Sequence, residues 1–241
     1  MSTTTTRICS YGGFGAMVFW VIGFFAISGF VPPPSPTATA QQVAERFLEH
    51  GNAIRIGLMF TAFGGALVGL WTAAVAVFLK RIEGRFSPLT YVQLTMGGLI
   101  CVEFITPMLT WFVAAYRPER APEITQALDD LAWIPFIGAT YTIIVQAFAV
   151  ALAILSDKRA NPILPRWVGY VTVFDLLGMI PAAFLIFFKT GPLAWNGIFA
   201  FWLVAISYTM WIVVTSVAML KNLDRLPEAD DEPASPVAVA G

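Results

Sequence analysis

Charged side chains are scarce in this chain: Asp, Glu, Lys and Arg make up 12% of the 241 residues, about half of the usual share. Hydrophobic residues make up 58%, and the mean hydropathy is +0.74. A soluble protein of this composition would have too little polar surface to cover its core. The 14 basic and 15 acidic residues leave no positive charge to attract a polyanion. A soluble enzyme, a disordered chain and a nucleic-acid-binding protein are therefore excluded, and an integral membrane protein is predicted.

The residue types that hold metals and form disulfides are also few. The chain has one histidine, His50, and two cysteines, Cys9 and Cys101, without a C-x-x-C motif. A His/Cys metal cage is therefore excluded, and the two cysteines are expected at different membrane depths, too far apart for a disulfide. The phosphate-binding loop, the nucleophile elbow, the H-E-x-x-H motif and the dinucleotide fingerprint are absent as well. We expect neither a metal nor a cofactor.

Apolar runs of about 20 residues, long enough to cross hydrocarbon of roughly 30 Å, occur six times, and only the third and the fifth contain a charged residue. Isolated strands in lipid would leave their backbone groups unpaired, so each run is interpreted as a helix. The expected spans are about 11–31, 56–79, 88–116, 131–156, 167–188 and 194–220. The predicted fold is an all-α, six-helix membrane bundle over residues 1–223. A disordered acidic and Pro/Ala-rich tail is expected over 224–241.

Basic residues in the loops predict the orientation of the bundle. Six spans place both termini and the second and fourth loops on one side, which carries nine Lys and Arg residues against five on the other. The nine are Arg7, Lys80, Arg81, Arg85, Lys158, Arg159, Arg166, Lys221 and Arg225. The positive-inside rule then puts both termini in the cytoplasm.

The N-terminal region also resembles a secretory signal peptide. Arg7 precedes an apolar stretch, and Ala38-Thr39-Ala40 fits a cleavage site. The stretch is about 21 residues long, which exceeds the apolar region of a usual signal peptide, and a proline-rich spacer follows it. We therefore expect the first span to be retained; cleavage would leave five spans and would not move the C-terminus.

Two longer loops are expected on the side opposite the termini. In the first, residues 41–50 are predicted to form a short amphipathic helix with Val43, Phe47 and Leu48 on its apolar face. The other loop, residues 117–130, carries charges of both signs. We interpret it as a solvated loop with local ion pairs; the alternative is a lid over an outward-facing cavity.

Two acidic residues, Glu103 and Asp175, lie inside the expected third and fifth spans. A charge at a helix centre costs roughly 2.5–3.5 kcal/mol on insertion scales, and no Lys or Arg lies at that depth to pair with either residue. We expect both carboxyls to be protonated where they are dry. Gln146, Ser207 and Tyr208 fall at similar depth, so these residues and the two acids are a candidate hydrogen-bonded cluster. Such a cluster either stabilises contacts between helices or forms a ligand, proton or substrate site.

Prolines accompany both acids. Pro107 lies four residues after Glu103, and Pro181 lies six residues after Asp175. Each proline removes a helix hydrogen bond, so both helices are expected to kink, which either opens a cavity or has no functional role. Trp111, deep in the third span, is a candidate wall of an apolar pocket, although packing against lipid or the core is the favoured interpretation.

Small residues in the second span predict a close contact between helices. Gly65 and Gly69 are four residues apart, the spacing at which two membrane helices approach closely. Packing within the bundle is the favoured interpretation, and a homo-oligomer interface is the alternative.

Two short motifs resemble those of a known group. His50-Gly51-Asn52-Ala53-Ile54-Arg55-Ile56-Gly57 precedes the second span, and Leu164-Pro165-Arg166-Trp167-Val168-Gly169-Tyr170 precedes the fifth. Both are similar to motifs of a broad group of uncharacterised bacterial six-span membrane proteins. The resemblance implies a multi-pass protein of the bacterial inner membrane, and it implies no activity. The arginines of both motifs are expected to reach lipid headgroups.

These features are compatible with three functions. Foremost, we expect a membrane protein that binds or helps move a small apolar or amphipathic molecule, or protons, through a midplane pocket. Its partners would be membrane lipid and a small hydrophobic ligand, and its predicted ligand-binding residues are Glu103, Asp175, Gln146, Tyr208 and Trp111. The first alternative is an intramembrane acid/base enzyme, of isomerase or cyclase type, acting on a lipid or terpenoid, with Glu103 and Asp175 as proton donor and acceptor. The second is a structural subunit of a membrane complex.

Overall fold

The computed structural model describes residues 3–226, so the tail predicted over 224–241 lies almost entirely outside the described residues. The described part is helical and contains no strand. Six helices are long and apolar enough to cross a membrane: Thr3–Ile27, Ala40–Glu83, Pro88–Tyr116, Pro122–Ser156, Arg166–Phe187 and Ile198–Lys221. The predicted all-α bundle of six membrane helices is thereby confirmed.

Several of these spans combine two kinds of helix. The elements in chain order are α1 (Thr3–Trp20), the π-helix η1 (Val21–Ile27), α2 (Ala40–Glu83), α3 (Pro88–Tyr116), α4 (Pro122–Gly138), α5 (Tyr141–Ser156), α6 (Arg166–Met179), the 3-10 helix η2 (Ile180–Phe187), the π-helix η3 (Ile198–Trp202), α7 (Leu203–Lys221) and the 3-10 helix η4 (Leu223–Arg225).

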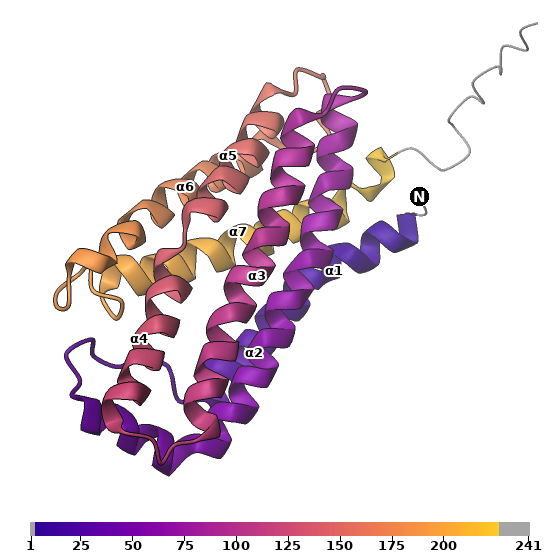
Figure 1. Cartoon of the computed structure of the whole chain (residues 1–241). Helices are drawn as coiled ribbons and strands as arrows, with labels where there is room; N and C mark the ends of the chain where they lie inside the picture. Colours follow the sequence, from indigo (N-terminus) through magenta and orange to yellow (C-terminus); the bar gives the residue numbers. More distant parts are fainter. Residues whose placement is uncertain (1–2, 227–241) are drawn as a thin grey trace, which may run out of the picture.

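The helices form a closed bundle (Figure 1). Going around it, α2 packs against α1 and α3, α5 packs against α3 and α6, and α7 packs against α6 and α1. The α4 helix covers the remaining side by contacting α3 and α2. Each of these helices thus has at least two helical neighbours, which is how a membrane bundle buries its polar groups away from lipid.

The α2 helix is longer than predicted. The segment 41–50 is not a separate amphipathic helix but the first part of this 44-residue helix, which at 1.5 Å per residue measures about 66 Å. A capping box at Thr39 starts it, and Gly84 ends it. Val43 and Phe47 are buried as expected, whereas Leu48 is 55% exposed. Figure 1 shows these first turns, in dark purple, lying across the end of the bundle below α4.

The fourth span also begins earlier than predicted. Only residues 117–121 connect α3 to α4, because Pro122 occupies the first turn of a helix, where its missing N–H costs nothing. The interpretation of 117–130 as a solvated loop is therefore wrong for its second half. The span is also interrupted at Ala139 and Thr140, which separate α4 from α5.

The two membrane prolines behave differently. The α-helix of α3 continues through Pro107, whereas the α-helix of α6 gives way to the 3-10 helix η2 directly before Pro181. A proline disrupts the hydrogen bond to the carbonyl four residues before it. The change to 3-10 geometry at Pro181 therefore has a local cause, and it follows closely on the helical turns that carry Asp175.

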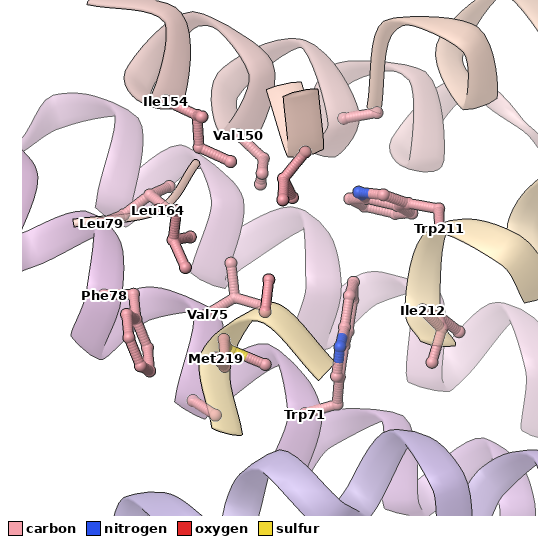
Figure 2. Packing of buried hydrophobic residues seen from close by; sticks show 14 of the residues in the cluster. Trp71, Val75, Phe78, Leu79, Val150, Ile154, Leu164, Trp211, Ile212 and Met219 are labelled. Atoms are coloured by element: carbon pink, nitrogen blue, oxygen red, sulfur yellow. The ribbon is translucent and has the colours of Figure 1, made fainter. Parts of the chain in front are cut away.

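Two hydrophobic clusters form the core. One lies among α2, α5, α6 and α7 (Figure 2), where the rings of Trp71 and Trp211 meet edge to face with centroids 5.0 Å apart. The other surrounds Trp111 and Trp133, whose ring centroids are 4.9 Å apart. Rigid aromatic packing thus holds both ends of the bundle.

The glycine pair of α2 faces α3 within the same chain. A Cβ atom at Gly65 would lie 2.9 Å from Cβ of Phe104, and one at Gly69 would lie 3.5 Å from Sγ of Cys101. The close contact that this spacing predicts is therefore made inside the bundle.

Candidate functional site

A cavity of about 660 Å³ lies at membrane depth between η1, α3, the junction of α4 and α5, and the first half of α7. Its volume falls in the range of roughly 300–1,000 Å³ that is usual for small-molecule sites. Apolar and aromatic side chains dominate its lining, and Glu103 is the only acidic or basic residue among the lining residues that the structure describes. The cavity therefore suits a largely apolar molecule.

Irregular backbone surrounds this cavity on three sides. The π-helix η1 contributes Phe24 and Phe25, and the π-helix η3 contributes Phe201 and Trp202. Thr140, in the break between α4 and α5, contributes the third side. Single π-helical turns occur frequently at functional sites, and non-helical backbone at membrane depth is tolerated where it lines a cavity. The segments that depart from regular α-helix thus lie around the cavity.

Three stacked rings form one wall of the cavity. Trp20 and Phe104 lie with ring centroids 4.5 Å apart, and Phe104 and Tyr208 lie 5.9 Å apart, with interplanar angles of 25° and 21°. The Trp20 indole N–H is already used, since it donates to the Thr61 carbonyl at 3.2 Å. The wall therefore offers a flat apolar face to a ligand.

Polar groups gather at one part of the lining. A Glu103 carboxyl oxygen accepts a hydrogen bond from the Thr142 hydroxyl. The hydroxyls of Tyr208 and Thr140 are buried and have no hydrogen-bond partner within residues 3–226. A buried hydroxyl without a partner costs about 1–3 kcal/mol. A bound molecule with one polar end would relieve that cost, so Glu103, Tyr208 and Thr140 are candidates for recognising such an end.

The cavity reaches the outer surface of the bundle. Among its lining residues, Val21 and Phe25 of η1 are 58% and 45% exposed, and Ile206 of α7 is 61% exposed. These exposed apolar side chains lie on membrane-crossing helices and would face lipid. The opening between η1 and α7 is therefore directed sideways, toward the acyl chains.

The five residues predicted to bind a ligand are divided by the structure. Glu103 and Tyr208 line the cavity, whereas Asp175, Gln146 and Trp111 are not among its described lining residues. Tyr208 nevertheless connects the two acids, because its hydroxyl lies within electrostatic range of both Glu103 and Asp175. Both carboxyls thus lie near one tyrosine, and of the two only Glu103 is among the described lining residues.

Asp175 is buried on α6 beside the Ser207 hydroxyl. Neither of its carboxyl oxygens has a partner in the described part of the chain. The adjacent hydroxyl, that of Ser207, donates instead to the Val204 carbonyl at 3.3 Å. An acid in this setting is either protonated or satisfied by a group other than protein.

Gln146 is likewise buried, and neither atom of its amide has a partner among the described residues. Its Nε2 atom lies only 2.6 Å from the position that a Cβ of Gly97 would take. Gln146 therefore belongs to a polar region where α3 and α5 approach closely, outside the cavity.

Trp111, predicted to bind a ligand, is paired with a carboxylate and is not among the described residues that line the cavity. Its indole N–H donates to Asp129 Oδ1 at 2.7 Å, and Asp129 Oδ2 lies 3.8 Å from Arg46 Nη1. Sequence reasoning missed Asp129 because it was placed in a solvated loop. Helical spacing of Asp129, Ala132 and Trp133 after Pro122 is the pattern that predicts its burial.

The arginine of the first motif also differs from expectation. Arg55 donates to the carbonyl of Ala115, in the last turn of α3, and to the Asn52 side chain. A cation at the C-terminal end of a helix satisfies free carbonyls there. Arg55 therefore connects α2 to α3, a role that the expected contact with lipid headgroups does not include.

Within residues 3–226, no group of three or more His, Cys, Asp and Glu side chains is arranged to hold a metal ion. Fold and site define a multi-pass helical membrane protein with an apolar cavity at membrane depth. Comparison with protein-family models, curated proteins and solved structures found no match.

Proposed function

We propose that this protein binds a small, largely apolar molecule with a single polar end in the cavity beside Glu103. The observation that carries the proposal is the composition of the cavity wall: stacked and clustered aromatic rings, one carboxyl, and the hydroxyls of Tyr208 and Thr140, which lack a partner within residues 3–226. Ligand sites typically combine such apolar walls with a few convergent polar groups. The molecule enters from the bilayer, because the opening is bordered by lipid-facing side chains.

Ligand binding fits this cavity better than acid/base catalysis does. An enzyme of the kind considered above needs two carboxyls at one reacting molecule, but Asp175 is not among the described lining residues. A purely structural subunit would have its interior filled and its polar groups paired, and here a volume of about 660 Å³ is left open. A proposed function therefore has to account for this cavity.

The proposal is tested with 1-aminoanthracene, a flat apolar ring system with one polar group whose fluorescence is excited by energy transfer from tryptophan. Trp20 and Trp202 line the cavity, so binding by the purified protein in lipid nanodiscs is expected to give energy transfer. Native mass spectrometry of the same preparation is expected to detect a co-purified molecule of the same chemical class.

Two matched variants locate the binding. Ala205→Trp places a large ring in the cavity, whereas Ala66→Trp places the same ring on the exposed side of α2, away from the lining. We expect Ala205→Trp to weaken binding at least about tenfold, which is about 1.4 kcal/mol, and Ala66→Trp to bind like the parent. Equal binding by both variants would show that the probe only partitions into lipid, and the proposal would be refuted. Ala205→Leu provides a smaller replacement if the tryptophan prevents folding.

We also propose that the protein resides in the bacterial inner membrane with both termini in the cytoplasm. The excess of basic residues on the side of the termini supports this orientation. A fluorescent protein that folds only in the cytoplasm, fused to the C-terminus, is expected to be bright. A periplasmic alkaline phosphatase that is active in the same position would contradict the orientation.

A further inference from the structure

One face of α3 carries polar groups from the α2–α3 loop to the level of the cavity. Thr90, Gln93, Gly97 and Cys101 follow one another at intervals of three or four residues, so they lie on the same side of the helix. From Gln93 to Glu103 the distance along the axis is about 15 Å at 1.5 Å per residue. This stripe thus spans half of the membrane.

Glu83 occupies the loop end of the stripe. One of its carboxylate oxygens accepts hydrogen bonds from the Thr90 hydroxyl at 2.6 Å and the Thr90 N–H at 2.7 Å. The other accepts from the Leu89 N–H at 3.0 Å. Glu83 is partly exposed, so it places an ionisable group where water and the buried stripe meet.

The middle of the stripe lies where α2, α3 and α5 converge. Gln93 Nε2 donates to the Thr72 carbonyl at 3.1 Å. Thr72 Oγ1 and Gln146 Nε2 lie 2.5 and 2.6 Å from the position that a Cβ of Gly97 would take. The missing side chain of Gly97 therefore lets polar groups of three helices gather at one place.

The inner end of the stripe lies at Cys101, near Tyr208. The Cys101 thiol donates to the Gly97 carbonyl with Sγ 3.4 Å from the oxygen. Tyr208 lies within electrostatic range of Cys101, Glu103 and Asp175. Glu83, Cys101, Glu103, Asp175 and Tyr208 are thus the titratable groups along this route, to which α5 adds the Gln146 amide.

Seven polar atoms along this route are buried without a protein partner within residues 3–226. They are Gln93 Oε1, Thr72 Oγ1, both amide atoms of Gln146, both carboxyl oxygens of Asp175 and the hydroxyl of Tyr208. Each costs about 1–3 kcal/mol if it is left unsatisfied. Buried water typically forms about three hydrogen bonds with such groups. Ordered water among these atoms would remove a cost that protein contacts alone leave in place.

We propose that these groups form a hydrated path that carries protons between the α2–α3 loop and the acids Asp175 and Glu103. A proton enters at the loop, each water or hydroxyl gains one proton and releases another, and the last proton converts a carboxylate to a carboxylic acid. No electron transfer is involved. The path goes beyond ligand binding and does not require the cavity to be occupied. Its loop end is on the side that the basic residues predict to be cytoplasmic.

Infrared spectroscopy of the protein in lipid nanodiscs tests the path. The C=O stretch of a protonated carboxyl shifts when deuterium replaces its proton, so transfer into D₂O reports proton access. The Glu103→Gln and Asp175→Asn variants assign the two bands, recorded at a pH where both are fully developed. We expect the parent bands to shift well before the helix amides exchange.

Variants of the path are expected to slow this exchange. Thr72→Val removes a hydroxyl without changing side-chain shape, and Gln146→Met removes the amide. Each is expected to slow the shift of the Asp175 band at least about tenfold, equivalent to about 1.4 kcal/mol in the barrier. Thr110→Val, the same change at a partly exposed position of α3 away from the path, is expected to match the parent.

The outcomes separate the path from ligand binding. If no carboxyl band develops at low pH, if the bands shift only with the helix amides, or if Thr72→Val and Thr110→Val exchange equally fast, the path is refuted.

Thermal unfolding gives a second readout. In a dry core, Gln146→Met would raise the Tm by removing an unpaired amide, whereas in a hydrated path it would not. Binding of 1-aminoanthracene by Thr72→Val is expected to be unchanged, so failure of either proposal is recognised independently.

Discussion

The cluster formed by Asp129, Trp111 and Arg46 provides the sharpest test of how the outer end of the bundle is stabilised. Asp129 is 2% exposed and accepts the Trp111 indole N–H at 2.7 Å. The Arg46 Nη1 atom, 3.8 Å from the carboxylate, is buried and has no other partner in the described part of the chain. The cluster joins α2, α3 and α4, so replacing Asp129 by Ala should loosen three helices at once.

The size of the effect follows from what Asp129→Ala leaves behind. Breaking a fully buried ion pair by removing one member costs about 3–5 kcal/mol. The cost here lies at the low end of that range, because 22% of the Arg46 side chain is exposed. Leaving the Trp111 indole N–H without an acceptor costs about 1–3 kcal/mol more. The two costs do not simply add, because the guanidinium and the indole share Asp129 as their partner. We expect a total of about 4 kcal/mol for Asp129→Ala. Asp129→Asn keeps an acceptor for Trp111 and loses only the charge, so it should be less damaging.

Thermal unfolding in detergent, recorded at the same scan rate for every variant, measures the order of their stabilities. For a chain of this size, about 4 kcal/mol corresponds to a decrease in Tm of roughly 10 °C. The expected ranking of Tm is parent, then Asp129→Asn, then Asp129→Ala. In the background of Arg46→Met, the effect of Asp129→Asn on the Tm should shrink, since the cation is gone. A Tm for Asp129→Ala within about 2 °C of the parent would refute the reasoning.

Two further predictions concern a loop and a helix contact. Burial alone would raise the pKa of Asp157, but hydrogen bonds from the Ile163 and Arg159 N–H groups and the Arg159 guanidinium hold that pKa below its ordinary value. Its stabilising contribution is therefore present above about pH 3.9 and is lost as the pH falls through the lower folded-state pKa. Asp157→Asn should cost about 2 kcal/mol at pH 7 and less near pH 3, as followed by Tm. Gly97→Ala should destabilise by about 1–3 kcal/mol, because its Cβ would lie 2.3 Å from an α2 side-chain carbon. Gly98→Ala, with nothing within 4 Å, should instead stabilise the helix by about 0.5–1 kcal/mol, and a similar change in Tm for both would contradict the packing.

The sequence predicts the number of membrane helices because charges interrupt the apolar runs. It does not predict where three of those helices begin, since the spans expected from 11, 56 and 131 start at Thr3, Ala40 and Pro122. Asp129 looks like a residue that ends a membrane span, but its carboxylate is paired inside the protein rather than exposed to lipid. The start of α2 is missed for a similar reason, since Arg46 is partly buried beside that carboxylate. A charge ends a span only where no partner from another helix reaches it, and partners depend on tertiary structure.

The site is predictable to a similar degree. Membrane depth identifies Glu103 and Tyr208, both of which line the cavity. Depth cannot separate them from Asp175, because residues at one depth still face different sides of their helices. The sequence does not identify Thr140 and Trp20 as site residues. Thr140 lies in the break between α4 and α5. Trp20 belongs to a ring stack that is assembled from three helices. The break follows Pro135 and Gly138, both of which are sequence signals for the end of a helix, whereas a stack across helices leaves no periodic pattern in sequence.

The contrast between Asp129 and Asp175 bears on function. Both are buried acids on membrane-crossing helices, yet Asp129 is paired with an indole and a guanidinium, and Asp175 has no partner within residues 3–226. The bundle can therefore satisfy a buried carboxyl, although buried polar atoms without a protein partner within residues 3–226 also occur elsewhere, among them Trp71 Nε1, Thr215 Oγ1 and Ser216 Oγ. The unpaired atoms of Asp175, Tyr208 and Gln146 are found beside the cavity or along one face of α3. Stability alone would favour apolar replacements at these positions, so the presence of polar side chains there is consistent with the proposed binding of a ligand, water or protons.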